Sequence, residues 1–512
     1  MLFLFTSVFL ALPTTFAGWS LPTIPLIQQD VWVEIQQGTL PLVISAPHGG
    51  IEKPKFMADR TEGNLIRDRG VREVAFALAD ELEWLTGHRP FVVTTRLHRV
   101  KLDANRAIEE AAQGNETAEK VWHQYHAALE NCTTQAKVIG KGRALILDIH
   151  GHAHPEDWVE LGYGVDANAL AKNDQDLKDA AWIRGPKSLG SFFTAQGLRA
   201  VPSPAIRHPA GKKYFNGGYI TRRHRGEGLR SIQLELPWSL RNAKASQASI
   251  AQLAGGISEF FAAHFSIPVP NLNPKNFPAE GPLAVFGHDF DRYSSAFGIP
   301  ILATKNLAKE KLRHAVHMLA EYLDNDENGV VDDVGVLKAL RHGGAFLVMP
   351  ARERDMRKLS RGFGRWERAG WNIGQDLYGE ETNSTGRFDA ALEEIWHLVS
   401  NGWGEAYPDV FSFEKGSQLC DAMDRARKPG GHYHYGDPTC NYHCQAAEYS
   451  YWVLTTLLGA QKNSNRAEEI FEEWECATAE ELKKRDPAAV HLFTHPKFSL
   501  PHQLPNGSYR EN

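Results

Sequence analysis

Two histidines, each followed by glycine, are the residues of this 512-residue sequence that point most directly to chemistry. His48 follows the apolar run PLVISAP, and His150 follows the mostly apolar run ALILDI. Zinc in a catalytic site usually takes three histidine or carboxylate ligands and keeps one position for water. We therefore expect His48 and His150 to bind one Zn²⁺ ion, because the adjacent glycines let the backbone approach closely.

The third ligand and the general base are sought among the carboxylates near these runs. Asp68 lies at the predicted start of a helix, from which it can point back to the same strand edge, and we expect it to complete the zinc site. Glu52 and Asp59 are the alternatives. Glu235 ends the run SIQLEL and is the expected general base, which takes a proton from water and passes it to a leaving nitrogen.

Polar residues that suit a substrate follow another apolar run, FVVTTRLH. Asn105 and Arg106 suit a substrate carboxylate, because a guanidinium binds it through two parallel hydrogen bonds. Arg99 is expected to take part in catalysis, and Tyr219, in the glycine-containing loop YFNGGYIT, to contact the substrate. Each residue alone has a structural interpretation as a turn, core or helix-capping residue. Their joint placement after apolar runs favours a metal-dependent hydrolase.

These residues share one site if the runs that carry them are neighbouring parallel strands. Residues 41–47, 91–98, 143–150 and 229–236 are predicted strands, and the first three alternate with predicted helices. This alternation is typical of an α/β fold, a mostly parallel sheet with flanking helices. In such a sheet, ligands bind outside the carboxyl ends of the strands. Further elements are expected at 158–164 (strand), 68–85, 116–136, 189–196 and 246–265 (helices).

Several motifs of this region also carry a family resemblance. SAPHGG, the R-x-x-x-D-x-N-R element from Arg99 to Arg106, LDIHGHAH, ELGY, GGYIT and QLELP occur in this order between about residues 35 and 265. Together they resemble the N-formylglutamate amidohydrolase family and, more distantly, aspartoacylases and zinc carboxypeptidases. The resemblance implies a phosphorylase/hydrolase-like fold, one zinc ion and hydrolysis of an amide bond next to a free carboxylate.

The resemblance also implies roles for single residues. His48 and His150 match the histidine ligands, Asn105 and Arg106 the carboxylate-binding pair, and Glu235 the catalytic carboxylate. The chain lacks the glutamate that aspartoacylases carry three residues after the first histidine. Asp68 as third ligand is therefore an inference from its position, and the resemblance does not specify the substrate.

Length and composition predict at least two domains and an extracellular location. We expect a signal peptide at 1–17, a hydrolase domain at 18–266, a proline-rich linker at 267–283 and a mainly helical domain at 284–512. The apolar amino-terminal run is too short to span a bilayer, so no membrane span is expected after its removal. A net charge of -6 without blocks of like charge gives no reason to expect nucleic acid as a partner.

Glycosylation sequons and cysteines agree with secretion. Four sequons are present, at Asn115, Asn131, Asn383 and Asn506. Four of the five cysteines lie in the carboxyl-terminal half and allow up to two disulfides, namely Cys420, Cys440, Cys444 and Cys476. Cys132 is left over. A metal site of Cys440, His443 and Cys444 is the competing interpretation.

The second half contains an acidic loop directly after a predicted helix at 309–323. Asp324, Asp326, Asn328 and Asp332 occupy positions 1, 3, 5 and 9 of an EF-hand-type loop, so oxygen ligands could surround Ca²⁺. Position 12 is Gly335, which lacks the bidentate acid. A calcium site and a solvated acidic turn therefore both remain as interpretations.

Another group of candidate ligands lies on predicted helices at 388–399 and 445–458. The run EEIWH places acids and His397 on one helix face, with His432, His434 and Glu448 downstream. This pattern differs from H-E-x-x-H, so a buried His–Glu hydrogen bond and a second metal site both explain it. The nearby aromatic residues are expected in the core.

Three functional hypotheses follow. The first is a secreted zinc amidohydrolase that acts on an N-acyl amino acid or a peptide terminus, small substrates with a free carboxylate. The second is a calcium-stabilised extracellular binding protein whose hydrolase domain is inactive. The third is metallopeptidase activity in the helical domain.

Overall fold

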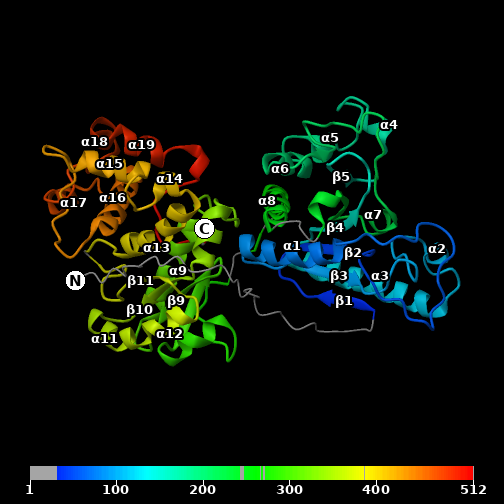
Figure 1. The fold of residues 1–512 in the computed structure, drawn as a ribbon, viewed down its shortest axis with the longest axis horizontal. Helices are drawn as coiled ribbons and strands as arrows, with labels where there is room; N and C mark the ends of the chain where they lie inside the picture. The colour runs from blue at the N-terminus through cyan, green and yellow to red at the C-terminus, as the bar shows by residue number, and fades with distance from the viewer. Residues whose placement is uncertain (1–31, 243–246, 266, 269–270, 386, 511–512) are drawn as a thin grey trace. The chain divides into compact units, whose positions relative to one another are not determined.

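The computed structural model describes residues 32–242, 247–265, 267–268, 271–385 and 387–510. The predicted signal peptide at 1–17 and part of the predicted linker lie outside the described residues. Contacts divide the chain into two compact units, before and after residue 270, and each is described by itself (Figure 1).

The first unit is built on a seven-stranded sheet with the order β1-β3-β2-β4-β7-β5-β6. Strands β3, β2, β4 and β7 are parallel to one another, whereas β1 and β5 pair antiparallel with the two ends of this central group. The α/β prediction is therefore confirmed. The strands are β1 (Val33–Gln36), β2 (Leu42–Ala46), β3 (Phe91–Thr95), β4 (Ala144–Gly151), β5 (Val159–Gly162), β6 (Ala200–Val201) and β7 (Leu229–Leu236).

Helices cover this sheet because its central strands are mostly apolar and buried. All five residues of β2 are buried, as expected for a strand covered on both faces. Helix α3 packs on Val43, Val93 and Ile146, while α1 contacts the same strands and α8. The helices are α1 (Val71–Thr86), α2 (Ile108–Ala112), α3 (Glu116–Ile139), α4 (Ala167–Leu170), α5 (Ala180–Arg184), α6 (Leu189–Ala195), α7 (Tyr219–Arg223) and α8 (Gln247–His264).

The start of α1 differs from the prediction. Gly70 precedes the helix with φ 85°, a left-handed conformation that glycine adopts without strain. The helix therefore begins at Val71, and Asp68 lies in the loop before it rather than in its first turn.

The second unit is mainly helical, as predicted, and also contains a sheet that the sequence patterns did not predict. Its order is β11-β10-β9-β8, with only β8 antiparallel to its neighbour. The strands are β8 (Arg292–Ala296), β9 (Ile299–Ala303), β10 (Ala345–Met349) and β11 (Ile373–Asp376). The helices are α9 (Lys309–Leu323), α10 (Val334–His342), α11 (Met356–Leu359), α12 (Phe363–Arg368), α13 (Ala391–Ala406), α14 (Pro408–Phe411), α15 (Gln418–Ala426), α16 (Tyr442–Leu457), α17 (Ser464–Ile470), α18 (Ala479–Arg485) and α19 (Pro487–Phe493).

Two cysteines of the second unit form a disulfide. In this structure Cys440 and Cys444 are joined by a disulfide bond. Their sulfur atoms are therefore not available to bind a metal ion together with His443. The described free cysteines, all buried, are Cys132, Cys420 and Cys476. Within the described residues, the helices are too short or too polar to cross a membrane.

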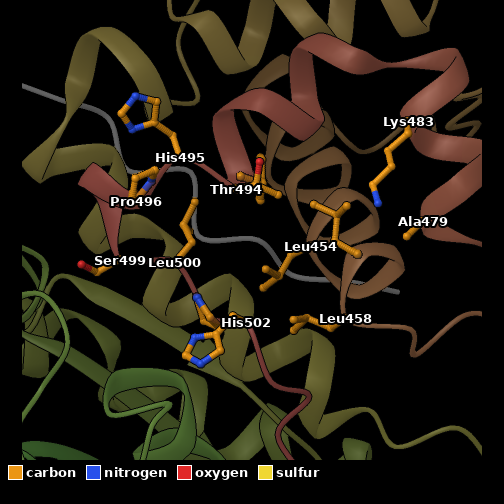
Figure 2. A pocket seen from close by; sticks show the side chains of 13 residues that line it. Leu454, Leu458, Ala479, Lys483, Thr494, His495, Pro496, Ser499, Leu500 and His502 are labelled. Atoms are coloured by element: carbon orange, nitrogen blue, oxygen red, sulfur yellow. The ribbon is translucent and has the colours of Figure 1, made fainter.

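A cavity of about 430 Å³ lies in the second unit among α16, α18, α19 and the segment that follows them (Figure 2). Its lining is mixed: Leu454, Leu458 and Leu500 are apolar, whereas Lys483 and His495 carry polar groups. None of the predicted site residues lines it.

Candidate metal centre

The sheet brings the predicted ligands and base to one edge. Because β2, β4 and β7 are parallel neighbours, their carboxyl ends meet at the same side. His48 follows β2, while His150 and Glu235 lie near the ends of β4 and β7 and oppose each other in the β4–β7 register. Residues that are far apart in sequence therefore come together, as the strand pattern predicted.

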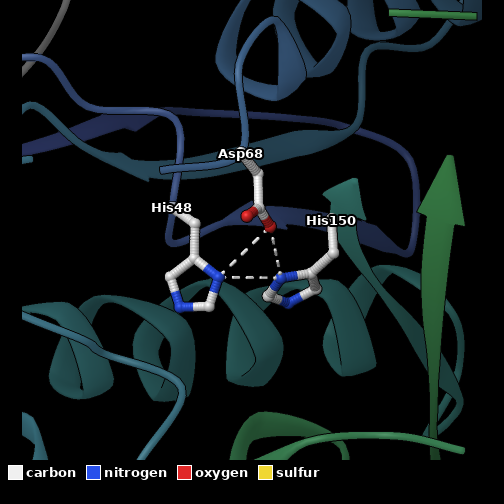
Figure 3. A group of neighbouring side chains, drawn as sticks. All are labelled: His48, Asp68 and His150. Atoms are coloured by element: carbon white, nitrogen blue, oxygen red, sulfur yellow. Dashed lines mark hydrogen bonds and ion pairs between the residues drawn. The ribbon is translucent and has the colours of Figure 1, made fainter. Parts of the chain in front are cut away.

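His48, Asp68 and His150 form a compact group (Figure 3). The two Nδ1 atoms lie 3.0 Å apart, and Asp68 Oδ2 lies 3.3 Å from that of His48 and 3.2 Å from that of His150. All three side chains are buried. Three ligand atoms thus face a common centre and could hold a metal ion.

A carboxylate lies behind each imidazole, on the side away from this centre. His48 Nε2 is 2.6 Å from Asp103 Oδ1, and His150 Nε2 is 2.8 Å from Asp148 Oδ2. When Nε2 carries the proton and donates a hydrogen bond to the carboxylate, the lone pair of Nδ1 is free to bind a cation. Metal-binding histidines usually have such a partner on the other nitrogen. The donor set therefore fits a metal ion in chemistry as well as in distance.

These two carboxylates are themselves held in place. The Ser45 hydroxyl donates to Asp148 at 2.7 Å. Nε of the Arg99 guanidinium donates a hydrogen bond to Asp103 at 2.9 Å, and its Nη1 lies 3.5 Å from Asp68. Arg99 is buried and contacts the acids that surround the imidazoles. Arg99 therefore positions these acids, and its part in catalysis stays a prediction.

The alternative third ligands point elsewhere. Glu52 forms an ion pair with Arg96, and Asp59 forms one with Lys101 at 2.5 Å. Asp68 is the carboxylate that reaches both imidazoles, although it precedes α1 instead of starting it.

The electrostatics of the group favour a positive charge at its centre. Burial alone would raise the pKa of Asp68, but the adjacent His48 and His150 outweigh burial and hold this pKa well below its usual range. Burial opposes the charged form of His150, yet Asp148 and Asp68 raise the pKa of His150 well above its usual value. The surrounding acids thus stabilise a cation between them.

Glu235 has the environment of a general acid or base. Burial raises the pKa of Glu235 to about 8, opposed by His150 and assisted by Asp68 and Glu160. Gln233 donates to Glu235 Oε1 at 2.8 Å, which orients the carboxyl group. A pKa near the working pH suits a group that both takes up and releases a proton.

Asn105 joins the glycine-containing loop to the site. Its Oδ1 accepts a hydrogen bond from the Ile220 backbone at 2.8 Å, and its Nδ2 lies 3.1 Å from His150 Nε2. A Cβ atom at Gly218 would lie 2.2 Å from Asn105 Nδ2, so this close approach requires glycine. Tyr219 packs beside His126, with ring centroids 5.6 Å apart.

Arg106 differs from Arg99 because some of its guanidinium N–H groups are not used in hydrogen bonds. Its side chain is 38% exposed and lies 3.8 Å from Glu110, a weak contact. One guanidinium nitrogen donates to the Asn105 carbonyl at 2.8 Å. Arg106 is therefore the better placed of the two arginines to bind an anion.

A second His–Glu group in this unit, which the sequence did not single out, is held by hydrogen bonds within the unit. His152 donates to the Trp158 carbonyl and accepts from the His154 backbone. Glu160 accepts hydrogen bonds from His154 at 2.7 Å and from the Phe215 backbone at 2.8 Å. The repeated histidines of LDIHGHAH thus stabilise the loop after β4.

The EF-hand-like loop is ordered by its own hydrogen bonds. Asp324, Asp326 and Asp332 form a group that could hold a metal ion. Asp324 is buried and accepts from the Tyr509 hydroxyl and from the Gly329 backbone. The side-chain amide of Asn328 donates a hydrogen bond to Asp326 at 3.0 Å. Calcium binding here stays a prediction from the sequence.

Comparisons with known proteins add little to this geometry. No family model and no curated protein matches the chain. Among solved structures, the crystal structure of gene product Atu2144 from Agrobacterium tumefaciens is 14% identical, with a TM-score of 0.30, and the match covers 45% of this chain and 92% of that chain. Similarity at this level carries no argument about family or function. The fold and site themselves define an α/β protein with a buried His–His–Asp group that could hold a metal ion.

Proposed function

We propose that the first unit is a zinc-dependent amidohydrolase that cleaves an amide bond next to a free carboxylate, in an N-acyl amino acid or at a peptide terminus. The observation that carries this proposal is the convergence of His48, His150 and Asp68 beside Glu235. Ligands about 2.0 to 2.1 Å from a tetrahedral zinc ion lie about 3.3 Å from one another. The separations of 3.0 to 3.3 Å between the three ligand atoms are close to this value.

The chain supplies proton transfer and positioning. A bound zinc ion supplies Lewis-acid polarisation of the substrate carbonyl and acidifies a water molecule. Glu235 takes a proton from the attacking water and returns it to the leaving nitrogen. Gln233 holds one of its oxygens, so the other oxygen is available to carry the proton.

Substrate selection is assigned to Arg106 and the glycine-containing loop. Arg106 is partly exposed and has free donors for a substrate carboxylate. Asn105 accepts a hydrogen bond from the loop that carries Tyr219. We assign Tyr219 as a contact for the acyl group or side chain of the substrate. Arg99 holds Asp103 and hence the ring of His48.

We also propose that the protein is secreted. The sequence at 1–17 supports this, as do the sequons. Asn131, Asn383 and Asn506 are exposed, whereas Asn115 caps α3 and accepts a hydrogen bond from the Ala118 backbone.

The experiment is hydrolysis of a panel of N-acyl amino acids by the purified protein with zinc. We expect His150→Ala to lose the activity and the zinc ion of the first unit. Glu235→Gln should keep zinc and lower kcat by about 10²- to 10⁴-fold, the usual contribution of general acid–base catalysis. Glu227→Gln, an exposed glutamate before β7, is the matched control. Wild-type activity in both site variants would show that the proposal is wrong.

A further inference from the structure

A second group of acids and one histidine lies in the mainly helical unit. Glu393 and His397 lie one turn apart on α13, and Glu448 comes from α16, which packs against α13. One ligand atom from each lies within 4.8 Å of the other two. The residues are 51 or more positions apart across the two helices, so the fold, not the local sequence, brings them together.

The imidazole of His397 is the informative member of this group. His397 is 3% exposed, and neither of its ring nitrogens makes a hydrogen bond. Its Nε2 lies 3.5 Å from Glu448, and its Nδ1 lies 3.8 Å from Glu394. These distances exceed those of normal hydrogen bonds. The buried His–Glu contact predicted for EEIWH is therefore present, but as ion pairs that are longer than a normal hydrogen bond.

The charges of the group also favour a bound cation. Glu393, Glu394 and Glu448 place three carboxylates around a single imidazole. Like charges that are largely removed from water repel each other strongly, whereas a divalent cation between them offsets the repulsion. A cation also accepts the lone pair of an imidazole nitrogen, which is otherwise costly to bury without a partner.

We propose that Glu393, His397 and Glu448 bind a divalent transition-metal ion. Imidazole and carboxylate donors suit Zn²⁺, Mn²⁺ or Fe²⁺. Glu393 and His397 have the i and i+4 spacing of the two histidines in an H-E-x-x-H helix, with Glu393 in place of the first histidine. Three protein ligands leave a coordination position for an exchangeable ligand. The proposal is independent of the function proposed for the first unit.

The test counts Zn²⁺ ions bound per full-length chain after dialysis and elemental analysis. We expect two ions in the wild type, one in His150→Ala and none in His150→Ala/His397→Ala. If the first site binds no zinc, the wild type should hold one ion that His397→Ala alone removes, so failure of either proposal is distinguishable. An ion that survives in the double variant, or a His150→Ala chain that holds none, overturns the second site.

A matched variant separates ligand loss from damage to the fold. His432 is also buried and lies 3.3 Å from an acid, Asp486, so His432→Ala should keep the second ion. In the His150→Ala background, which removes the ion of the first unit, Co²⁺ absorption reports coordination at the second site directly. It should vanish when His397→Ala is added and persist when His432→Ala is added. If His397→Ala fails to fold by circular dichroism, the near-isosteric Glu448→Gln decides: retention of the ion overturns the proposal, and its loss supports it.

Discussion

Asp148 Oδ2 lies 2.8 Å from Nε2 of His150, while Nδ1 of the same ring faces Asp68 at 3.2 Å. The ring therefore lies between two acids, one behind it and one in front of it. The rear acid determines which nitrogen carries the proton, and so which nitrogen is free to bind a cation. His48 has the same arrangement with Asp103 behind it.

Asp148→Asn should weaken zinc binding by about 10- to 100-fold, the usual effect of losing an outer-shell partner. An amide cannot enforce the same tautomer of His150, although it occupies the same space. Competition with a zinc chelator measures the change. Unchanged affinity would mean that Asp148 has no role in orienting the ring. Asp166→Asn, which alters an exposed helix cap, serves as the control.

Asp68→Ala should lose the zinc ion of the first unit, because it removes the carboxylate that contacts both imidazoles. Asp59→Ala should bind zinc as the wild type does, since Asp59 pairs with Lys101. Elemental analysis of both variants decides between these two candidate ligands. The reverse pattern would assign the third ligand to Asp59.

Arg106→Ala should raise KM for N-acyl amino acids by about 10-fold or more with a smaller change in kcat, because the lost interaction binds the substrate before and during reaction. Substrates whose carboxylate is blocked as an amide should be affected much less. Steady-state kinetics on both substrate types gives the comparison. An equal loss for both types would rule out carboxylate recognition by Arg106.

Gly218→Ala should destabilise the first unit by about 1–3 kcal/mol, as overpacking usually does, and reduce activity. The added Cβ would lie 2.2 Å from Asn105 Nδ2, so the loop or Asn105 must move. Gly226→Ala is the control, because a Cβ there meets nothing within 4 Å. Urea unfolding of the two variants measures the difference, and equal stabilities would contradict the expected clash.

A buried histidine pair should make the first unit sensitive to acid. His126 Nδ1 lies 2.8 Å from His224 Nε2. Burial, with each pair member's charged neighbours, lowers the pKa of His126 to about 3 and that of His224 to about 4. The unfolded chain, with pKa values of about 6.5, binds more protons below that pH. The pair's stabilisation is therefore complete above about pH 6.5 and is lost as the pH falls towards about 4.

The difference between the free energies of unfolding at about pH 7 and about pH 5 measures this effect. Each histidine should account for about 2 kcal/mol of the loss, and the pair for about 4 kcal/mol. A His126→Gln/His224→Gln variant should lose correspondingly less on acidification. His123→Gln, which changes an exposed histidine of the same helix, should behave as the wild type. Equal losses in the double variant and the wild type would contradict the assignment.

The strand ends of the first unit were predictable because apolar runs alternate with helices. This alternation implies parallel strands, and parallel strands place His48, His150 and Glu235 at one edge. The prediction of Asp68 depended on a helix start that the structure moves to Val71. Its carboxylate still reaches the imidazoles, because the loop after Asp68 turns back at Gly70.

The roles of the supporting residues were not predictable. Asp103, Asp148 and Arg99 are visible in the sequence as charged residues, but their roles depend on which way each side chain points from its strand or loop. The second sheet was missed for another reason. Runs such as AFLVM have only five residues, and periodicity cannot distinguish so short a strand from a buried helix segment.

The β4–β7 ladder pairs eight residues of each strand and holds His150 opposite Glu235 through backbone hydrogen bonds. Their spacing is therefore independent of the surface loops. Insertions or exchanges in segments such as 203–216 can therefore alter the exposed surface of this unit while His150 and Glu235 stay aligned. Such modularity makes this unit a suitable scaffold for altering selectivity by loop replacement.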